Sequence, residues 1–170
     1  MMYTRKRNKR TNYKKRLAYL LSRTPRLVIR RSNTKISAQI IEYHADGDKI
    51  IVSANSQELA NMGYRGRLKN IPSAYLTGLL IAKKAKKIPV QKVIPDIGFY
   101  TPIKGSFPFA LIKGIKDGGI TIDADESILP EESRLKGEHI SSFAKLHNKN
   151  VDLINLPQEI EKIKQKLLEK

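Results

Sequence analysis

The chain has 170 residues and a formal net charge of +17 at pH 7, from 33 Lys and Arg against 16 Asp and Glu. It contains no cysteine, which excludes disulfides and thiolate metal sites. No apolar run reaches the ~20 residues that a membrane span needs, so we expect a cytoplasmic protein of one domain with modest appendages.

The positive charge is concentrated at the N-terminal end. Residues 1–41 contain thirteen basic and no acidic side chains, whereas residues 117–170 contain eight basic and eleven acidic ones. A segment as basic as the first repels itself in isolation and indicates a polyanionic partner, above all nucleic acid. A basic membrane-surface helix is the competing interpretation. It needs a wide apolar face, and residues 5–16 offer only Tyr13.

Residues 1–25 are expected to form a basic arm with a short helix. Residues 1–12 have the composition of a disordered segment, and the helix should begin at Asn12, whose side chain can cap it. It should stop near Ser22, because Pro25 disfavours helix in the residue before it. Three leucines then share one face of this helix: Leu17, Leu20 and Leu21.

Residues 26–122 are expected to form an α/β RNA-binding core. The first three strands are predicted at Arg26–Arg31, Lys35–Tyr43 and Lys49–Ala54. Turn-rich separators of three or four residues join them, which forces an antiparallel meander. A helical turn over 56–62, capped by Ser56, should follow.

The second half of this core alternates helix and strand. A long helix is predicted at Ile71–Lys87, and its small residues, such as Gly78, indicate close packing on a sheet. Lys92–Ile97 should be a strand parallel to a neighbour, because a helical crossover precedes it. Phe107–Asp117 and Ile120–Ile122 complete the pattern as helix and strand. The predicted fold class is α/β, with a mixed sheet covered by helices.

Residues 123–170 are expected to form a helical C-terminal extension. The first part is polar and acid-rich, and its carboxylates lack the periodic spacing of a calcium loop. Further on, four apolar residues have helical spacing: Leu156, Ile160, Ile163 and Leu167. This apolar stripe either docks on the domain or binds a protein neighbour.

The alternative function is a metal-dependent nuclease built on such a sheet. Two-metal chemistry needs several carboxylates that hold cations about 4 Å apart, and Asp96 is the one well-placed candidate. The first strand and the long helix supply basic residues instead of acids, and the three histidines lack ligand spacing. We therefore expect a protein that is not an enzyme, with no catalytic residue, metal, cofactor or small-molecule substrate.

The candidate RNA-binding residues fall into three basic segments that could converge. The arm contributes Arg5, Lys6, Arg7, Lys9, Arg10, Tyr13, Lys14, Lys15 and Arg16, followed by Arg23 and Arg26. The first hairpin contributes Arg30, Arg31, Ser32, Asn33 and Lys35, and the loop Gly63–Lys69 contributes Tyr64, Arg65, Arg67 and Lys69. Guanidinium groups, small polar side chains and aromatic rings are the groups that bind phosphates, sugars and unstacked bases. For Tyr13 and Tyr64, packing against the domain is an equal alternative. The lysines at the end of the long helix, Lys83, Lys84, Lys86 and Lys87, either complement the helix dipole or contact RNA.

Several of these segments resemble the universal large-subunit ribosomal protein eighteen family in its archaeal form. The motifs occur in order and include YKKRL at 13–17, PRLVIRRSN at 25–33, AYLTGLL at 74–80, DIG at 96–98 and RLKGEHI at 134–140. The resemblance extends from about residue 3 to residue 147, and the last part of the chain contains no motif of this kind.

This resemblance implies a structural protein of the 50S subunit that binds 5S rRNA. Such a protein helps to attach 5S rRNA to 23S rRNA in the central protuberance, beside the universal large-subunit protein five. The resemblance also implies a sheet of ribonuclease-H-like topology without the nuclease carboxylates. On this analogy the arm and the Arg30–Lys35 hairpin are the main rRNA contacts, and the ribosome is the location.

Overall fold

The computed structural model describes residues 7–8, 11–147 and 151–168, and its centre is a five-stranded sheet. The strands are β1 (Arg26–Arg31), β2 (Ile36–Glu42), β3 (Lys49–Asn55), β4 (Lys92–Asp96) and β5 (Thr121–Ile122). Their order is β3-β2-β1-β4-β5, with β1, β2 and β3 antiparallel and β4 and β5 added in parallel. This confirms the predicted mixed α/β sheet and its ribonuclease-H-like strand order.

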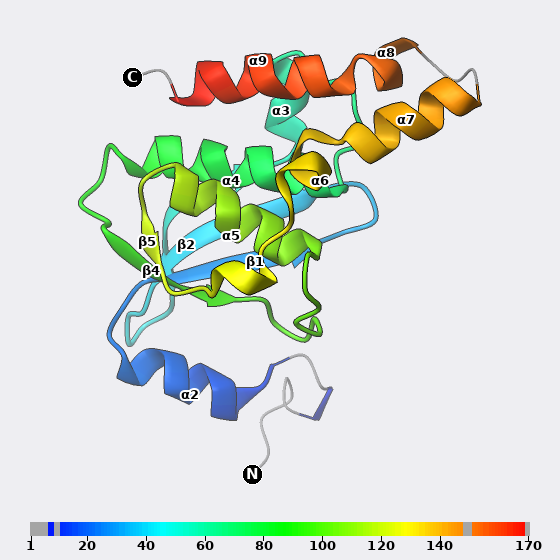
Figure 1. Ribbon diagram of the computed structural model, residues 1–170. Coiled ribbons are helices and arrows are strands. Elements are labelled where there is room, and N and C mark those ends of the chain that lie inside the picture. The colour runs from blue at the N-terminus through cyan, green and yellow to red at the C-terminus, as the bar shows by residue number, and fades with distance from the viewer. Residues whose placement is uncertain (1–6, 9–10, 148–150, 169–170) are drawn as a thin grey trace.

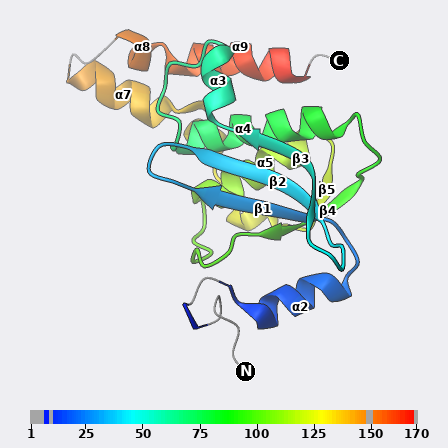
Figure 2. The ribbon, with the colours of Figure 1, turned by 180° about the vertical axis from the view of Figure 1, so that it is seen from behind.

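Helices lie on both sides of this sheet. They are α2 (Tyr13–Leu21), α3 (Gln57–Asn61), α4 (Ile71–Ala85), α5 (Phe107–Asp117), α6 (Glu132–Lys136), α7 (Glu138–Leu146), α8 (Val151–Ile154) and α9 (Leu156–Leu168), with a short 3-10 turn, η1, at Glu126–Ile128. Figure 1 shows α4 and α5 against one face of the sheet, α9 beyond α4, and α2 on the opposite side. The view from behind shows that α2 is the one labelled helix on that opposite side (Figure 2). Among the described residues, no helix has the length and apolar character needed to cross a membrane.

Alternation along the strands separates an apolar inner face from a polar outer face. In β1, Leu27 and Ile29 are fully buried under the helices, and Arg26, Val28 and Arg30 occupy the other face. The parallel register between β1 and β4 aligns Val28 with Asp96, which places this carboxylate on the outer face. The outer face therefore contains the charged residues and faces α2.

Helix α4 is the central helix of the fold, and twelve of its fifteen residues are buried. It crosses α5 at two glycines, because a β-carbon on Gly78 would collide with the backbone of Leu111 and one on Gly114 with the backbone of Tyr75. The prediction that the small residues of α4 pack on the sheet is therefore wrong for Gly78. That residue permits the close approach of two helices.

Ser56 does not cap α3 as predicted. Its backbone is already helical and its hydroxyl makes no capping bond. The Ser56 Oγ instead accepts a hydrogen bond from the Ile36 backbone N–H at 3.0 Å, so this side chain completes the start of β2. The hydroxyl therefore bonds to a residue of a distant strand and not to a backbone N–H of the helix that follows it.

The C-terminal helix docks on the domain, which decides between the two alternatives that the sequence left open. The four apolar residues of its stripe are buried in the same core as the sheet. At the far end of α9, the Lys83 ammonium of α4 donates to the Lys166 carbonyl at 2.6 Å. Lys84 is also bound within the protein, at 2.6 Å from Glu58 Oε2.

Two adjacent leucines of α9 provide a test of this docking. Leu167 is 3% exposed and Leu168 is 39% exposed. Leu167→Ala should lower the free energy of unfolding by about 2–3 kcal/mol, because it leaves a cavity against the core. Leu168→Ala, the matched control, should cost less than about 1 kcal/mol. Urea denaturation measures both, and equal costs would contradict the docked position of α9.

Candidate nucleic-acid interface

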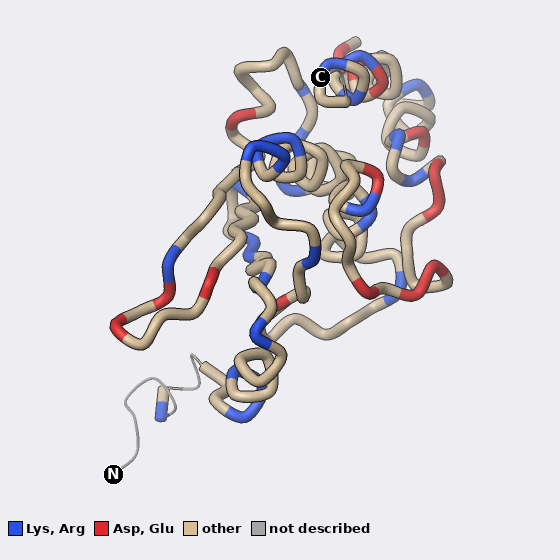
Figure 3. The backbone as a smooth tube through the Cα atoms, turned by 90° about the vertical axis from the view of Figure 1, so that its left-hand side faces the viewer, with Lys and Arg blue, Asp and Glu red and all other residues tan. Residues whose placement is uncertain are grey.

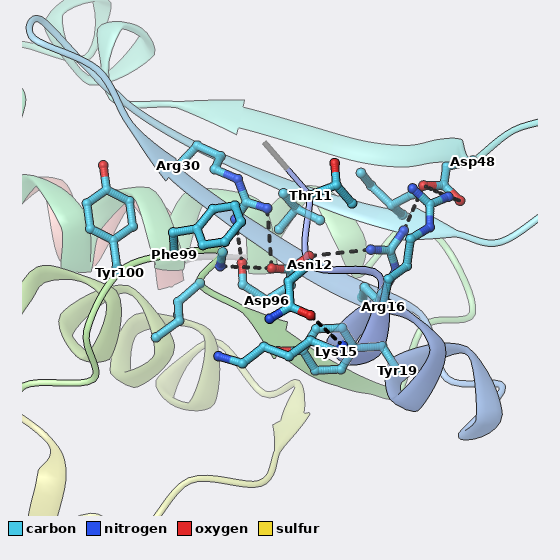
Figure 4. Close-up of a pocket in the computed structure, with 15 residues that line it drawn as sticks. Thr11, Asn12, Lys15, Arg16, Tyr19, Arg30, Asp48, Asp96, Phe99 and Tyr100 are labelled. Atoms are coloured by element: carbon cyan, nitrogen blue, oxygen red, sulfur yellow. Dashed lines mark hydrogen bonds and ion pairs between the residues drawn. The ribbon is translucent and has the colours of Figure 1, made fainter. Parts of the chain in front are cut away.

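A groove of about 460 Å³ lies between α2 and the outer face of the sheet. The α2 side contributes Thr11, Asn12, Lys15, Arg16 and Tyr19, and the rest is formed by Arg26, Val28, Arg30, Ile41, Asp48 and the segment Asp96–Tyr100. Figure 4 shows these side chains around the groove. Burial and, next, the nearby Asp96 carboxylate raise the pKa of Tyr19 above its usual value. The groove brings together parts of the arm, the first strand and the loop after β4.

The arm helix forms as predicted but is not held by its leucines. Asn12 caps it, because its Oδ1 accepts the Lys15 backbone N–H at 3.1 Å. None of its nine residues is buried, and Leu17 and Leu21 are 60% and 77% exposed. Two of the three leucines of the expected apolar face are therefore open to solvent, and Leu20 is only partly buried. The contact with the core is instead an ion pair, in which Arg16 Nη2 donates to both carboxylate oxygens of Asp48 at 3.0 Å.

Asp48 and Asp96 connect three arginines into a continuous chain of charges. Arg26, which is buried, donates from Nη2 to Asp48 Oδ2 at 2.7 Å and from Nη1 to Asp96 Oδ2 at 3.4 Å. Arg30 donates to the Asp96 carbonyl at 2.8 Å and to its Oδ1 at 3.3 Å. The tube view shows the basic positions of α2 and acidic positions of the β2–β3 connection on the same side of the sheet (Figure 3). This charge chain attaches the arm to the sheet.

These contacts determine the role of Asp96. Each of its carboxylate oxygens pairs with a guanidinium, and Oδ1 also accepts the Gly98 backbone N–H at 2.9 Å. Within the described residues, no group of three or more His, Cys, Asp and Glu gathers to hold a metal ion. The observed geometry supports a structural carboxylate and does not support the nuclease alternative.

The structure distributes the predicted binding residues unevenly. Arg5, Lys6, Lys9 and Arg10 lie outside the described residues. The exposed set comprises Arg7, Lys14, Lys15, Arg23, Arg30, Arg31, Ser32, Asn33, Arg65, Arg67 and Lys69, and Tyr13, Arg16 and Lys35 are partly buried. Arg26 and Tyr64 are buried. Arg26 therefore serves the charge chain and is not available to a phosphate.

Tyr64 is a packed ring and not a stacking platform, which corrects its assignment as an RNA contact. It is 3% exposed, and its hydroxyl lies 3.1 Å from Asn70 Oδ1, to which it donates. Burial raises the pKa of this hydroxyl well above its usual value. Gly66 packs against this ring and Leu156, where a β-carbon would have no room. This packing is enough to explain a glycine at position 66, and no contact with a phosphate is needed.

The loop Gly63–Lys69 does not converge with the arm. Arg65 Nη1 donates to Asp152 Oδ1 at 2.8 Å, and its backbone N–H reaches Glu159 at 3.4 Å. The loop therefore lies beside α8 and α9, on the side of the molecule opposite α2 (Figure 1). The expectation that three basic segments could share one surface is wrong, because the fold separates this loop from the other two.

Comparison with known proteins places the chain in a family. Residues 1–94 match the family described as "Ribosomal large subunit proteins 60S L5, and 50S L18". The chain is 43% identical over 168 residues to large ribosomal subunit protein uL18 of Ignicoccus hospitalis, with 98% of this chain and 79% of the relative covered. It is 44% identical over 167 residues to uL18 of Methanoregula boonei, with 98% and 94% covered. The chain belongs to the uL18 family. This confirms the family indicated by the sequence motifs.

The uL18 family match includes α2, β1, β2 and β3, and thus most of the groove. The remaining wall, Asp96–Tyr100, lies in the part of the chain aligned with both uL18 relatives. Sequence reasoning did not select Asp48 or Phe99, which also line the groove. Asp48 sits in an ordinary turn, and no local signal shows that it bonds to the arm. For Phe99 the sequence does contain a signal, because the turn formers Asp96 and Gly98 come just before it and can present an aromatic side chain at the surface.

The charge chain predicts a large effect of Asp96 on stability. Asp96→Asn keeps the shape and the acceptor for Gly98, but it leaves Arg30 without a charge partner and Arg26 with Asp48 alone. We expect the free energy of unfolding to fall by about 3 kcal/mol. Asp123→Asn is the control, because Asp123 is mostly exposed and pairs with Lys92 at the surface, and it should change stability by less than about 1 kcal/mol. Urea denaturation of both variants tests this, and a neutral Asp96→Asn would contradict the structural role.

Proposed function

We propose that the chain binds 5S rRNA with the arm, the groove and the β1–β2 hairpin, and thereby helps to attach it to 23S rRNA in the central protuberance. Membership of the uL18 family makes it a structural protein of the large ribosomal subunit. The finer assignment, which includes the universal large-subunit protein five as a neighbour, follows the family resemblance of the motifs. We also propose that the protein is not an enzyme.

The observation that supports this surface is which of its charged side chains are already paired within the protein and which are not. Four cations and two carboxylates line the groove, and both carboxylates are already paired with arginines. Lys14, Lys15 and Arg23 are exposed and form no ion pair with the described residues. Exposed cations that lack intramolecular partners are the groups that replace counterions on a nucleic-acid backbone. The surface thus presents excess positive charge to an RNA.

The β1–β2 hairpin supports a more specific contact. Ser32 accepts the backbone N–H of Lys35 at 3.1 Å through its hydroxyl, and its own N–H donates to the Lys35 carbonyl at 2.8 Å. Arg31 lies 4.9 Å from the centroid of the Phe107 ring, which restrains its guanidinium. A rigid hairpin with an exposed Asn33 at its tip can read sugar or base edges with little loss of entropy.

The position of Arg67 and Lys69 supports attachment to a second RNA surface. Both are exposed, form no ion pair with the described residues and lie on the loop beside the C-terminal helices. An RNA helix that contacts α2 would not cover this loop, because the loop lies on the opposite side of the molecule (Figure 1). The loop is then open to a different RNA segment. We assign the loop to 23S rRNA and the α2 side to 5S rRNA.

Salt dependence of 5S rRNA binding tests the proposed surface. Lys15→Ala should reduce the slope of log affinity against log salt by about 0.7–0.9, the value for one phosphate contact. Lys145→Ala is the matched control, because this exposed lysine is on α7, away from the groove. Equal losses in both variants, or no loss in either, would contradict the assignment of the α2 side to 5S rRNA.

The absence of catalysis has its own test. RNA and an RNA–DNA hybrid are incubated with the protein and either Mg²⁺ or Mn²⁺, and we expect no cleavage because Asp96 is enclosed by guanidiniums. Cleavage by the wild type that Asp96→Asn abolishes would overturn the proposal of a non-catalytic protein.

A further inference from the structure

Phe99 is an exposed aromatic ring in the groove, and it is not part of the charge chain that attaches the arm. Its side chain is 62% exposed, the largest value among the aromatic residues that the structure describes. It belongs to the loop between β4 and α5, and it makes no ring or cation contact with the described residues. Figure 4 shows it in the groove near Arg30.

The backbone around Phe99 is held on both sides. On one side, Gly98 has φ +66° and donates its N–H to Asp96 Oδ1 at 2.9 Å, and a β-carbon there would come within 3.0 Å of the Arg30 guanidinium. On the other side, the Tyr100 hydroxyl donates to the Arg31 carbonyl at 3.0 Å, and its ring packs edge-on to Phe107. The ring of Phe99 is therefore presented to solvent from a fixed turn.

Such an arrangement favours a flat, charged partner over an apolar one. A large ring in water loses the free energy of burial unless a ligand covers it. The groove beside it contains Lys15, and lysine is depleted from the cores of protein–protein interfaces. A nucleotide has both a π-face for the ring and a phosphate for the cations.

We propose that Phe99 stacks on an unpaired base of ribosomal RNA, with Lys15 and Arg30 beside the phosphates that flank it. The base must be unpaired or extruded, because bases inside an A-form helix are already stacked on their neighbours. The volume of the groove, about 460 Å³, is within the range of small-ligand sites. This inference rests on the proposed function and names the structural class of RNA that the groove accepts.

The absence of tryptophan from the chain makes a direct test possible. Phe99→Trp introduces a single fluorescent ring at the site, and stacking on a base should quench it. Purified 5S rRNA and 23S rRNA are titrated in separate arms. Because the α2 side is assigned to 5S rRNA, we expect quenching by 5S rRNA, and quenching by 23S rRNA alone would keep the stacking site but contradict that assignment. The control Phe143→Trp, which places the ring on exposed α7, should show no quenching. Absence of quenching by both RNAs would overturn the proposal.

Affinity measurements separate stacking from simple apolar contact. Phe99→Ala should weaken binding of the quenching RNA about 5- to 150-fold, the equivalent of ~1–3 kcal/mol for one stacked base. The salt slope should stay unchanged because no phosphate contact is removed. Phe99→Leu should weaken binding similarly, and Phe99→Tyr should restore it. Wild-type affinity for Phe99→Leu would overturn stacking.

These outcomes also separate this inference from the proposed function. If Lys15→Ala lowers the salt slope and Phe99→Ala changes nothing, the RNA-binding surface stands and the stacking site is wrong. If RNA binding responds to neither residue but Phe99→Ala releases a protein from the assembled subunit, the groove binds a protein and the inference fails. Far-UV circular dichroism and urea denaturation check that each variant is folded.

Discussion

Asp96 accepts hydrogen bonds from two arginines at once, and the outer face of the sheet is arranged around this carboxylate. A buried charge is costly unless it is paired and its hydrogen bonds are complete, and here Arg26, Arg30 and Gly98 complete them. Because Arg26 also bonds to Asp48, the same interaction extends from β4 through β1 to the arm helix. The groove, the position of α2 and the turn after β4 all depend on it.

Local chemistry predicted much of the fold. The helix Phe107–Asp117 and the strand Arg26–Arg31 were predicted with the bounds that the structure shows. Asn12 caps α2 as expected, since its partner is only three residues away. The apolar stripe of α9 also indicated correctly which residues are buried. In each case the signal and the contact that it describes lie within a few residues, or follow directly from periodicity.

The failures concern contacts between distant segments. Gly66, which packs on the buried Tyr64 ring, also packs against Leu156 of α9, some ninety residues further along the chain. The attachment of α2 through Arg16 depends on Asp48, and no periodic pattern indicates an ion pair between an arm and a turn. The separation of the loop Gly63–Lys69 from the arm likewise depends on the order of the strands and helices. A basic composition predicts an RNA partner, but only the fold shows which basic residues share a surface.

The crossing of α4 and α5 has a consequence for how this chain can vary. In an ordinary core, a larger side chain at one position can be compensated by a smaller one opposite. Gly78 and Gly114 each face the backbone of the other helix. Because no residue is smaller than glycine, a larger side chain at one position cannot be compensated by a smaller one at the other. Substitutions at these two positions therefore have no second-site suppressor within the pair, and rescue would require the two helices to move apart. Such a shift would also displace α9, which packs on α4. The docked C-terminal helix therefore adds to the constraint that keeps residues 78 and 114 as glycine.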